Sequence, residues 1–243
     1  MHIRLLQARL PSDPVREEER ASFAARIGIA PEQIEPYDLL SRSLDLEPVT
    51  AGVDLLLVGG SGAFGVTNDT PWMHPFIDLM AQMADTDTPM FASCFGFQAL
   101  VVGLGGTVRP DPDSAEVGTF ALSLTAEGKS DPLFSALPPT FNAQEGHKDR
   151  AFDLPSPLVH LAKSARTPFQ AARVVGKSIY ATQFHPELTH TDNRDRFMRY
   201  FDMYQSAFGA DEAQAIADAF DASDDSNALL RRFYDSVAAG NQP

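Results

Sequence analysis

Cys94 is the only cysteine of the 243-residue chain, and it lies between a short apolar run and an apolar segment of helical character. Residues 90–93 have the composition of a buried strand, and residues 95–104 have that of a helix. A strand that leads into a helix through one reactive side chain is typical of a nucleophile turn. The amino terminus of the helix favours a thiolate, and Gly96 removes a Cβ where helix and strand approach. The pattern therefore predicts a nucleophilic Cys94 rather than an inert buried thiol.

A His-Pro-Glu triplet, His185 to Glu187, follows far downstream. Residues i and i+2 of an extended segment face the same side, and Pro186 favours an extended conformation at His185. His185 can then reach Cys94 as a general base while Glu187 orients the imidazole, as in a catalytic triad. The alternatives are a strand-end histidine at a turn and a metal site that includes His190. The spacing does not match a zinc-protease motif, so we expect no metal.

Gly59 and Gly60 follow an apolar strand candidate at residues 54–58. Glycines let a loop bring its backbone N–H groups close to an oxyanion, although the same pair can be a plain turn. A nucleotide-phosphate loop fits less well, because there is no Gly-x-Gly-x-x-Gly pattern and no lysine follows in the P-loop position. We therefore expect no cofactor.

The chain resembles class I glutamine amidotransferases of the triad type in four segments that occur in the same order: 58–61, 93–98, 146–149 and 183–187. The resemblance extends roughly from Asp54 to Tyr204. It implies a catalytic triad and an oxyanion hole built from two backbone amides. By this resemblance the triad is Cys94, His185 and Glu187, and the amides are those of Gly60 and Phe95.

The resemblance also implies four substrate-binding residues, which are Gly59, Gln98, His147 and Asp149. Gln98 lies one helical turn after the nucleophile, on the same side of the helix. The His-x-Asp pattern resembles the segment that faces the α-amino and α-carboxyl groups in GMP-synthase-type amidotransferases. Two positions depart from the family pattern: Ala92 replaces a glycine, and Gly146 replaces a serine. We expect a slightly shifted turn at Ala92 and an altered grip on glutamine at Gly146.

The function implied by the resemblance is cleavage of the γ-amide of L-glutamine through a γ-glutamyl thioester, with ammonia released to an acceptor enzyme. The chain has neither room for a synthase nor an ATP-binding loop of the pyrophosphatase kind. We therefore expect a free-standing subunit whose possible partner is a synthase. One alternative is a γ-glutamyl peptidase that acts on γ-glutamyl conjugates. Another is a non-catalytic partner-binding module, against which the complete cysteine, histidine and glutamate set argues.

Composition limits the other classes. The net charge of −14 argues against nucleic acid and anionic membranes as partners. No apolar run approaches the roughly 20 residues that span a bilayer, and Arg4 and Arg9 interrupt the N-terminal segment where a secretory signal would be apolar. A single cysteine cannot form an intramolecular disulfide, which indicates a reducing compartment. We expect a cytoplasmic protein.

Strand and helix candidates alternate through residue 104 and predict an α/β fold. Strands are expected at 3–8, 33–39, 54–58 and 89–93, and helices at 15–27, 70–83 and after Cys94. This order predicts a mainly parallel central sheet with helices on both faces, a three-layer sandwich. The resemblance implies the flavodoxin-like fold of class I glutamine amidotransferases.

After Gly106 the pattern changes to strands with little helix between them, at 117–125, 140–146, 158–164, 169–175 and 178–183. We expect them to form an antiparallel extension at one edge of the sheet. A helix over 193–208 closes the amidotransferase-like domain, which we assign to residues 1–208. Residues 209–243 are expected to form a helical appendage with helices at 211–220 and 227–239, packed back on the domain in preference to binding a partner.

Overall fold

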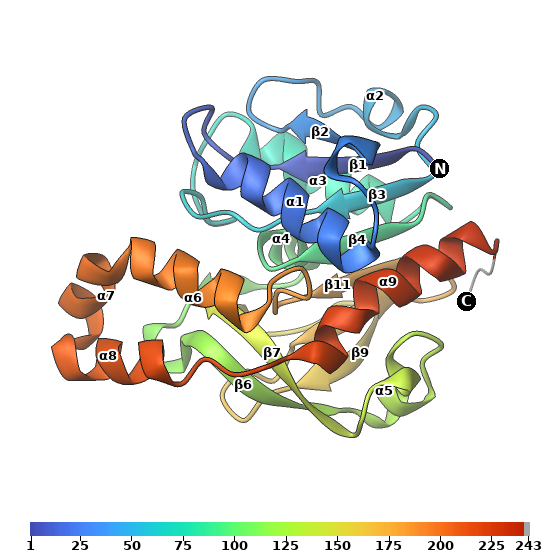
Figure 1. Cartoon of the computed structure of the whole chain (residues 1–243). Coiled ribbons are helices and arrows are strands. Elements are labelled where there is room, and N and C mark those ends of the chain that lie inside the picture. Colours follow the sequence, from blue (N-terminus) through green and yellow to red (C-terminus); the bar gives the residue numbers. More distant parts are fainter. Residues whose placement is uncertain (241–243) are drawn as a thin grey trace.

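Nine strands form the central sheet of the computed structural model, which describes residues 1–240 (Figure 1). The strand order is β2-β1-β3-β4-β11-β10-β9-β6-β7. The first five strands in this order run parallel: β2 (Ile34–Asp38), β1 (Ile3–Gln7), β3 (Leu55–Val58), β4 (Met90–Ser93) and β11 (Ile179–Thr182). Every residue of β1, β3, β4 and β11 is buried, as expected of parallel strands that are covered on both faces. The predicted parallel sheet is confirmed.

The other four strands are antiparallel: β10 (Ala171–Val174), β9 (Leu158–Lys163), β6 (Glu116–Leu124) and β7 (Thr140–His147). The predicted antiparallel extension is therefore confirmed. A second sheet of two strands, β5 (Val108–Pro110) and β8 (Asp149–Ala151), was not expected from the sequence. Short helical segments complete the connections: α2 (Leu46–Thr50), α5 (Ala126–Ser130), η1 (Pro31–Gln33), η2 (Pro112–Ser114) and η3 (Phe134–Ala136).

Helices cover both faces of the sheet. α1 (Val15–Ile27) and α9 (Asp224–Ala238) lie on one face, and α3 (Met73–Met83) and α4 (Phe95–Gly103) lie on the other (Figure 1). Side chains alternate between the faces along each strand, so that Leu57 joins the core under α1 and α9 while Leu56 and Val58 join the core under α3 and α4. The predicted three-layer sandwich is confirmed.

The last helix contributes to the core of the sheet. Leu229, Leu230 and Phe233 of α9 are buried, and the ring of Phe233 lies 5.5 Å from that of Phe91 and 5.6 Å from that of Tyr180. The C-terminal segment thus packs back on the sheet. The division into a 1–208 domain and a 209–243 appendage stays a prediction, and residues 241–243 lie outside the described residues.

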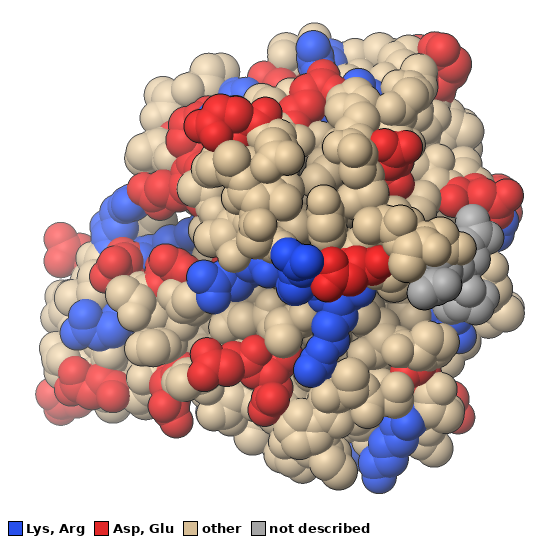
Figure 2. All heavy atoms as spheres, turned by 45° about the vertical axis from the view of Figure 1, so that its right-hand side comes forward, with Lys and Arg blue, Asp and Glu red and all other residues tan. Residues whose placement is uncertain are grey.

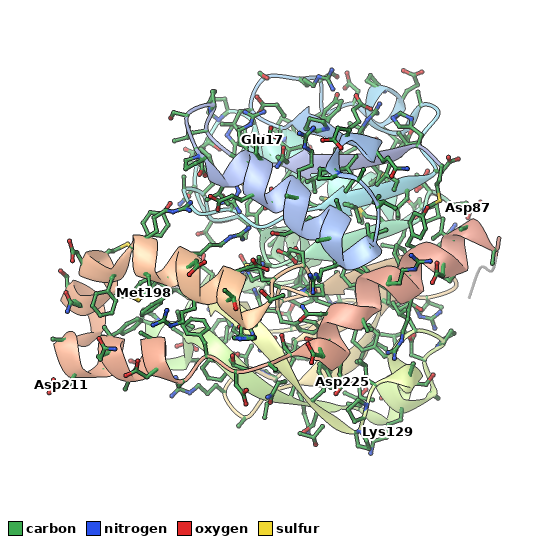
Figure 3. All side chains as sticks on the ribbon, viewed as in Figure 1. Glu17, Asp87, Lys129, Met198, Asp211 and Asp225 are labelled. Atoms are coloured by element: carbon green, nitrogen blue, oxygen red, sulfur yellow. The ribbon has the colours of Figure 1, made fainter. Side chains whose placement is uncertain are left out.

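Three further helices form a separate group beside β6 and β7: α6 (His190–Arg199), α7 (Phe201–Phe208) and α8 (Ala210–Asp218) (Figure 1). Phe197 and Tyr204 stack with ring centroids 4.3 Å apart in their small core. The helix expected over 193–208 is in fact two helices, because the chain leaves helical geometry at Tyr200, where φ is −112° and ψ is 23°. Figure 3 labels Met198 on α6 and Asp211 on α8 within this group.

Acidic and basic side chains are interspersed over the face of the molecule that Figure 2 shows, and acidic groups are widespread on it. This distribution fits the net charge of −14. Among residues 1–240, no helix combines the length and the apolar character needed to cross a bilayer.

Candidate active site

Cys94 forms the junction between β4 and α4, with φ 48° and ψ −98°. It is the only non-glycine residue with a positive φ in the described part of the chain. Its amide donates to Thr182 O (2.7 Å), and its carbonyl accepts from the amide of Gln98 (3.0 Å). A strained backbone that its neighbours hold in place is a recurrent feature of functional sites. The sharp strand-to-helix turn expected at Cys94 is present.

Gly96 makes this turn possible. A Cβ at this position would lie 2.8 Å from Val58 Cγ1 and 3.0 Å from Ala92 Cβ, closer than side-chain carbons pack. Ala92, which replaces a family glycine, is accommodated because Gly96 has no side chain. The departure at Ala92 therefore leaves the junction intact.

His185 and Glu187 follow β11 and lie behind the turn. His185 Nδ1 is 2.6 Å from Glu187 Oε1, and the amide of His185 donates to Gln144 O (2.8 Å) on β7. Gly60 shows how close the imidazole is to the thiol: a Cβ there would lie 2.9 Å from His185 Cε1 and 3.8 Å from Cys94 Cβ. The structure thus brings together the three residues predicted as a triad.

The charged forms of His185 and Glu187 stabilise each other. Burial opposes a charged imidazole, but the Glu187 carboxylate and Cys94 outweigh it and raise the pKa of His185 from 6.5 to about 10. Burial likewise opposes ionisation of Glu187, and the imidazolium overcomes it, so that the pKa of Glu187 lies below its usual value. A protonated His185 is therefore favoured between Glu187 and Cys94.

Two backbone amides were predicted to form the oxyanion hole. Phe95 is the first residue of α4, so its N–H has no acceptor within the helix. Its ring stacks on that of Phe76 with centroids 5.4 Å apart, which fixes the start of the helix. Gly60 lies against Cys94 and His185, as described above. Both predicted residues thus adjoin Cys94, and an oxyanion hole formed by their amides stays a prediction.

Gly59, predicted to bind substrate, faces the other way. A Cβ on Gly59 would lie 2.5 Å from Glu19 Oε1 on α1. Glu19 is fully buried and accepts from Arg9 Nη2 (2.9 Å). Glycine is thus needed at this position because the loop packs directly on the Glu19 carboxylate.

A cleft of about 730 Å³ opens over Cys94. Cys94, Phe95, Gln98, His147 and Asp149 are the predicted site residues that line it. Its outer wall is formed by apolar and aromatic residues: Leu10, Phe64, Tyr200, Met203 and Tyr204. The other predicted site residues, Gly59, Gly60, His185 and Glu187, lie behind its lining.

Within the cleft, Gln98 joins two walls. Its Nε2 donates to Asp149 O (2.9 Å) and to Gln183 Oε1 (3.1 Å). The Asp149 carboxyl lies near Gly65 and Thr67, where burial raises its pKa and a hydrogen bond from Thr67 opposes the change. Both residues thus line the cleft, and their contact with substrate stays a prediction.

His147 is placed differently from the prediction. Its ring is buried, with Nδ1 3.0 Å from Asp149 O and Nε2 3.1 Å from Glu116 Oε2. Both ring nitrogens therefore face groups of the protein rather than a substrate in the cleft. The second carboxylate near this ring is that of Glu145, whose Oε2 is 3.5 Å from Nε2.

Sequence reasoning missed Gln183, Glu116 and Glu145. Gln183 is fully buried, and its Nε2 lies 3.7 Å from Cys94 Sγ. The sequence could have indicated Gln183, because it lies two residues before His185 and an extended segment places both side chains on the same side. Burial and the neighbouring Glu116 raise the pKa of Glu145 well above its usual value. Its only sequence signal is its position two residues before His147.

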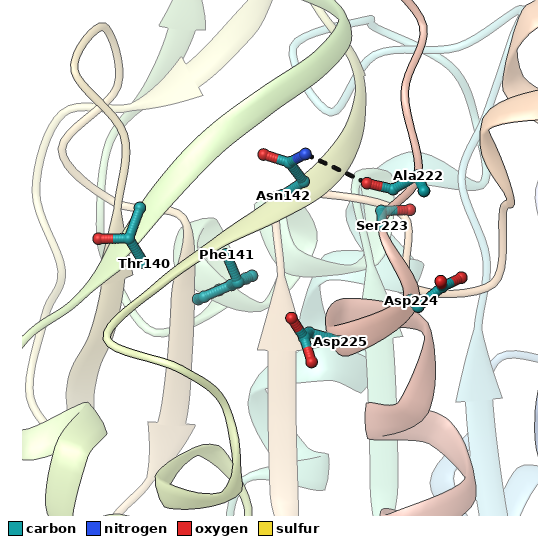
Figure 4. Close-up of a pocket in the computed structure, with 7 residues that line it drawn as sticks. All are labelled: Thr140, Phe141, Asn142, Ala222, Ser223, Asp224 and Asp225. Carbon is teal, nitrogen blue, oxygen red and sulfur yellow. Dashed lines mark hydrogen bonds between the residues drawn. The ribbon is translucent and has the colours of Figure 1, made fainter.

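A second, smaller hollow of about 260 Å³ lies at the start of α9 (Figure 4). Residues 140–142 and 222–225 line it, and Asn142 Nδ2 donates to Ala222 O (3.2 Å) across it. The Asp224 and Asp225 carboxylates stand in the first turn of α9, where they complement the helix dipole. None of the predicted site residues lines this hollow, so the cleft over Cys94 is the candidate site.

The chain is similar to proteins of known family. The family model of class I glutamine amidotransferases matches residues 33–203. A glutamine-hydrolysing GMP synthase from Thermosipho africanus is 32% identical over 146 residues, which are 60% of this chain and 26% of that protein. The chain thus spans about a quarter of the length of the curated relatives it matches.

Solved structures show the same fold at lower identity. A glutamine amidotransferase from Thermotoga maritima has a TM-score of 0.72 at 17% identity, covering 99% of this chain and 98% of that one. Another, from Methylobacillus flagellatus, has a TM-score of 0.63 at 17% identity, covering 98% and 92%. These two likenesses concern the fold, whereas the family model matches well over half of the chain. The chain therefore belongs to the class I glutamine amidotransferase family.

Proposed function

We propose that the protein hydrolyses the γ-amide of L-glutamine through a γ-glutamyl thioester on Cys94. The observation that carries the proposal is the convergence of three groups at one turn. Cys94 stands at a strained strand-to-helix junction, and His185, which lies against it, is bound to Glu187 at 2.6 Å. A cysteine with a base and an orienting carboxylate is the arrangement of cysteine-dependent acyl transfer.

In the first half-reaction His185 holds the proton of the Cys94 thiol, and the thiolate attacks the γ-carbonyl carbon. Because Nδ1 of His185 is engaged by Glu187, Nε2 is the nitrogen that exchanges protons with thiol and substrate. As the tetrahedral intermediate collapses, the carbon–nitrogen bond breaks and Nε2–H protonates the leaving nitrogen. The products of this step are ammonia and the thioester.

In the second half-reaction neutral His185 takes a proton from water, and the resulting hydroxide attacks the thioester carbonyl. The carbon–sulfur bond breaks, glutamate leaves and the Cys94 thiolate is regenerated beside the imidazolium. Glu187 accepts no proton in either step. It holds the imidazole in one orientation and stabilises its charge.

The amides of Gly60 and Phe95 are proposed to bind the oxyanion of both tetrahedral intermediates. Gln98 and Asp149 line the cleft and are proposed to contact the substrate, with Asp149 near its α-amino group. For Gly59 and His147 the proposed contribution is indirect, because Gly59 packs on Glu19 and the ring of His147 is held by Asp149 and Glu116.

We further propose that the ammonia passes to a synthase active site. The support is the similarity to the amidotransferase portion of proteins named GMP synthase. Because the chain matches only about a quarter of those relatives, the acceptor reaction and the identity of the partner belong to the proposal.

A second candidate substrate class is γ-glutamyl conjugates, and the size of the cleft favours it. A volume of about 730 Å³ falls in the range of pockets that bury drug-sized ligands. Its outer wall carries Tyr200, Met203 and Tyr204, which suit an apolar leaving amine. The thioester is the same for both classes, and only the leaving amine differs.

The test combines turnover with covalent trapping. The purified chain is assayed with glutamine and with γ-glutamyl dipeptides that carry an apolar second residue, and a glutamine-mimicking electrophile is followed by intact mass. We expect one adduct, on Cys94, that is absent from Cys94→Ala. Trapping keeps the test decisive for an enzyme that turns over slowly without a partner. An adduct of equal yield on Cys94→Ala contradicts the assignment, and turnover of dipeptides without glutamine supports the second class.

A further inference from the structure

The described residues include one cluster of buried ionisable groups that the proposed chemistry does not use. Glu116 and Glu145 are fully buried, and His147 is 4% exposed. One potential ligand atom from each of the three residues lies within 4.8 Å of the others. We call these three residues the Glu116–Glu145–His147 cluster.

The fold brings the cluster together on one face of two paired strands. Glu116 of β6 stands directly opposite His147 of β7 in the antiparallel register. Glu145 lies two residues before His147 and therefore points to the same face. Three residues that are spread over the sequence thus meet through strand pairing alone.

The cluster has more acceptors than donors. Glu145 Oε1, Glu145 Oε2 and Glu116 Oε1 have no hydrogen-bond partner in the described structure, and neither has Oε1 of the fully buried Gln170. Gln170 donates through Nε2 to Glu116 Oε2 (2.5 Å), so its amide lies at the edge of the cluster. Within residues 1–240, neither carboxylate forms an ion pair with a lysine or an arginine. Burying such a group without a positive partner is costly.

The tautomer of His147 adds a further acceptor. Nδ1 lies 3.0 Å from Asp149 O, and only a protonated nitrogen can donate to that carbonyl. In the neutral ring Nε2 then carries a lone pair, directed at Glu116 Oε2 (3.1 Å) and Glu145 Oε2 (3.5 Å). A histidine whose Nδ1–H is bound to a backbone carbonyl while Nε2 faces other ligands is typical of metal sites.

The distances match a small divalent ion. Nitrogen and oxygen ligands lie about 2.0–2.2 Å from zinc, so two ligand atoms at a tetrahedral angle are about 3.4 Å apart. The two contacts of His147 Nε2, at 3.1 and 3.5 Å, bracket this separation. One imidazole and two carboxylates are ligands that zinc and neighbouring first-row ions accept.

We propose that the Glu116–Glu145–His147 cluster binds a divalent transition-metal ion of the zinc type, with Gln170 Oε1 beside it. This departs from the sequence expectation of no metal, which weighed His185, Glu187 and His190. The ion ties β6 to β7 and neutralises the two carboxylates. His147 lines the cleft, which gives the ion a route from solvent. The site uses none of the proposed triad residues, although Glu145 lies near enough to His185 and Cys94 to interact with their charges.

The experiment measures zinc binding by the full chain after treatment with a chelator, using equilibrium dialysis and elemental analysis. It is done in a Cys94→Ala background, because the thiolate and His185 can themselves bind zinc. We expect one zinc ion per chain. Adding Glu145→Gln should weaken binding at least about 100-fold, since loss of even an outer-shell partner costs 10–100-fold. The matched control is Glu127→Gln, an exposed residue on α5, which should leave affinity unchanged.

A second measurement does not depend on the Glu145 variant folding. Ring-nitrogen resonances of the six histidines are followed by NMR during zinc addition to Cys94→Ala. We expect the Nε2 signal of His147 to shift, and the signals of the exposed His2 to remain in place. The proposal is overturned by the absence of stoichiometric zinc, by equal binding in Glu145→Gln, or by shifts confined to other histidines. The carboxylates would then be held by shared protons.

Discussion

His185 Nδ1 lies 2.6 Å from Glu187 Oε1, two residues away on the same side of an extended segment. This contact engages one imidazole nitrogen and leaves the other for Cys94, which lies beside the ring. The two residues therefore have unequal roles in the proposed reaction, because His185 exchanges protons and Glu187 orients it.

The first prediction compares the loss of these two side chains. His185→Ala should lower kcat about 10²–10⁴-fold, since it removes general acid–base catalysis. Glu187→Gln should cost at least about tenfold less, because an amide oxygen can still accept from Nδ1–H. The measurement is kcat for glutamine. A Glu187→Gln variant as slow as His185→Ala, with an unchanged melting temperature, would falsify this division of roles.

The second prediction concerns the charge of His185. The Glu187 carboxylate and Cys94 overcome burial and raise the pKa of His185 from 6.5 to about 10. Because the folded pKa is raised, the stability gained from the charged imidazole is present below about 6.5 and is lost as pH rises through about 10. In Cys94→Ala one source of the increase is gone, so the imidazole should titrate at lower pH.

This titration can be followed by NMR of the ring nitrogens, with His160 as an internal reference, since it lies on β9 outside the site. The pKa of His185 in Cys94→Ala should lie below the wild-type value, while Glu187 keeps it above 6.5. An unchanged pKa in Cys94→Ala would mean that the thiol and the imidazole do not interact.

The third prediction tests the contact between Gly60 and the imidazole. A Cβ on Gly60 would lie 2.9 Å from His185 Cε1, so Gly60→Ala must displace the ring. Misplacing a catalytic group by about 1 Å can cost on the order of 10²-fold in rate. Gly146→Ala is the matched control, because its Cβ would lie 3.7 Å from His185 Nε2, an ordinary contact. Both variants are compared by kcat at saturating glutamine, so that a change in substrate binding at Gly146 does not enter. We expect slow turnover in the first variant and near-normal turnover in the second. Equal rates would remove Gly60 from the site.

The parts of the fold that the sequence predicts are those with local signals. Each of these signals lies within one short stretch of the chain, so the sequence predicts it directly. They are the apolar runs at β3 and β4, the glycines after β3 and the cysteine before α4. The prediction over 193–208 was wrong at Tyr200, because the apolar face continues through the position where the helix breaks. The break allows Phe197 to stack on Tyr204 within the core shared with α8.

The residues that were missed depend on long-range pairing. Glu116 faces His147 only because β6 and β7 pair in one register, and no local pattern fixes that register. Gln183 approaches Cys94 because β11 lies beside β4. Gly59 likewise faces Glu19 only because α1 packs against the loop after β3. Each contact is a consequence of tertiary packing. Periodicity gives the side of a strand on which a residue lies but not the partner that it meets.

The last prediction concerns the C-terminal helix. Phe233 of α9 is buried between the rings of Phe91 and Tyr180 on the sheet, so Phe233→Ala should lower the free energy of unfolding by about 3–5 kcal/mol. Asp235→Ala is the control on the same helix. It removes only an exposed ion pair with Arg231, which adds little to stability because solvent screens it. Urea denaturation of both variants gives the two values.

If residues 209–243 form an independent appendage, Phe233→Ala should unfold only α9 and leave the remaining transition unchanged. If α9 belongs to the core, one cooperative transition should shift to lower urea. We expect the second result, because the side chains beneath α9 include Leu57 and Phe91 of the parallel strands. The same strands precede Gly59 and Cys94, so a truncation that removes α9 should also reduce trapping at Cys94.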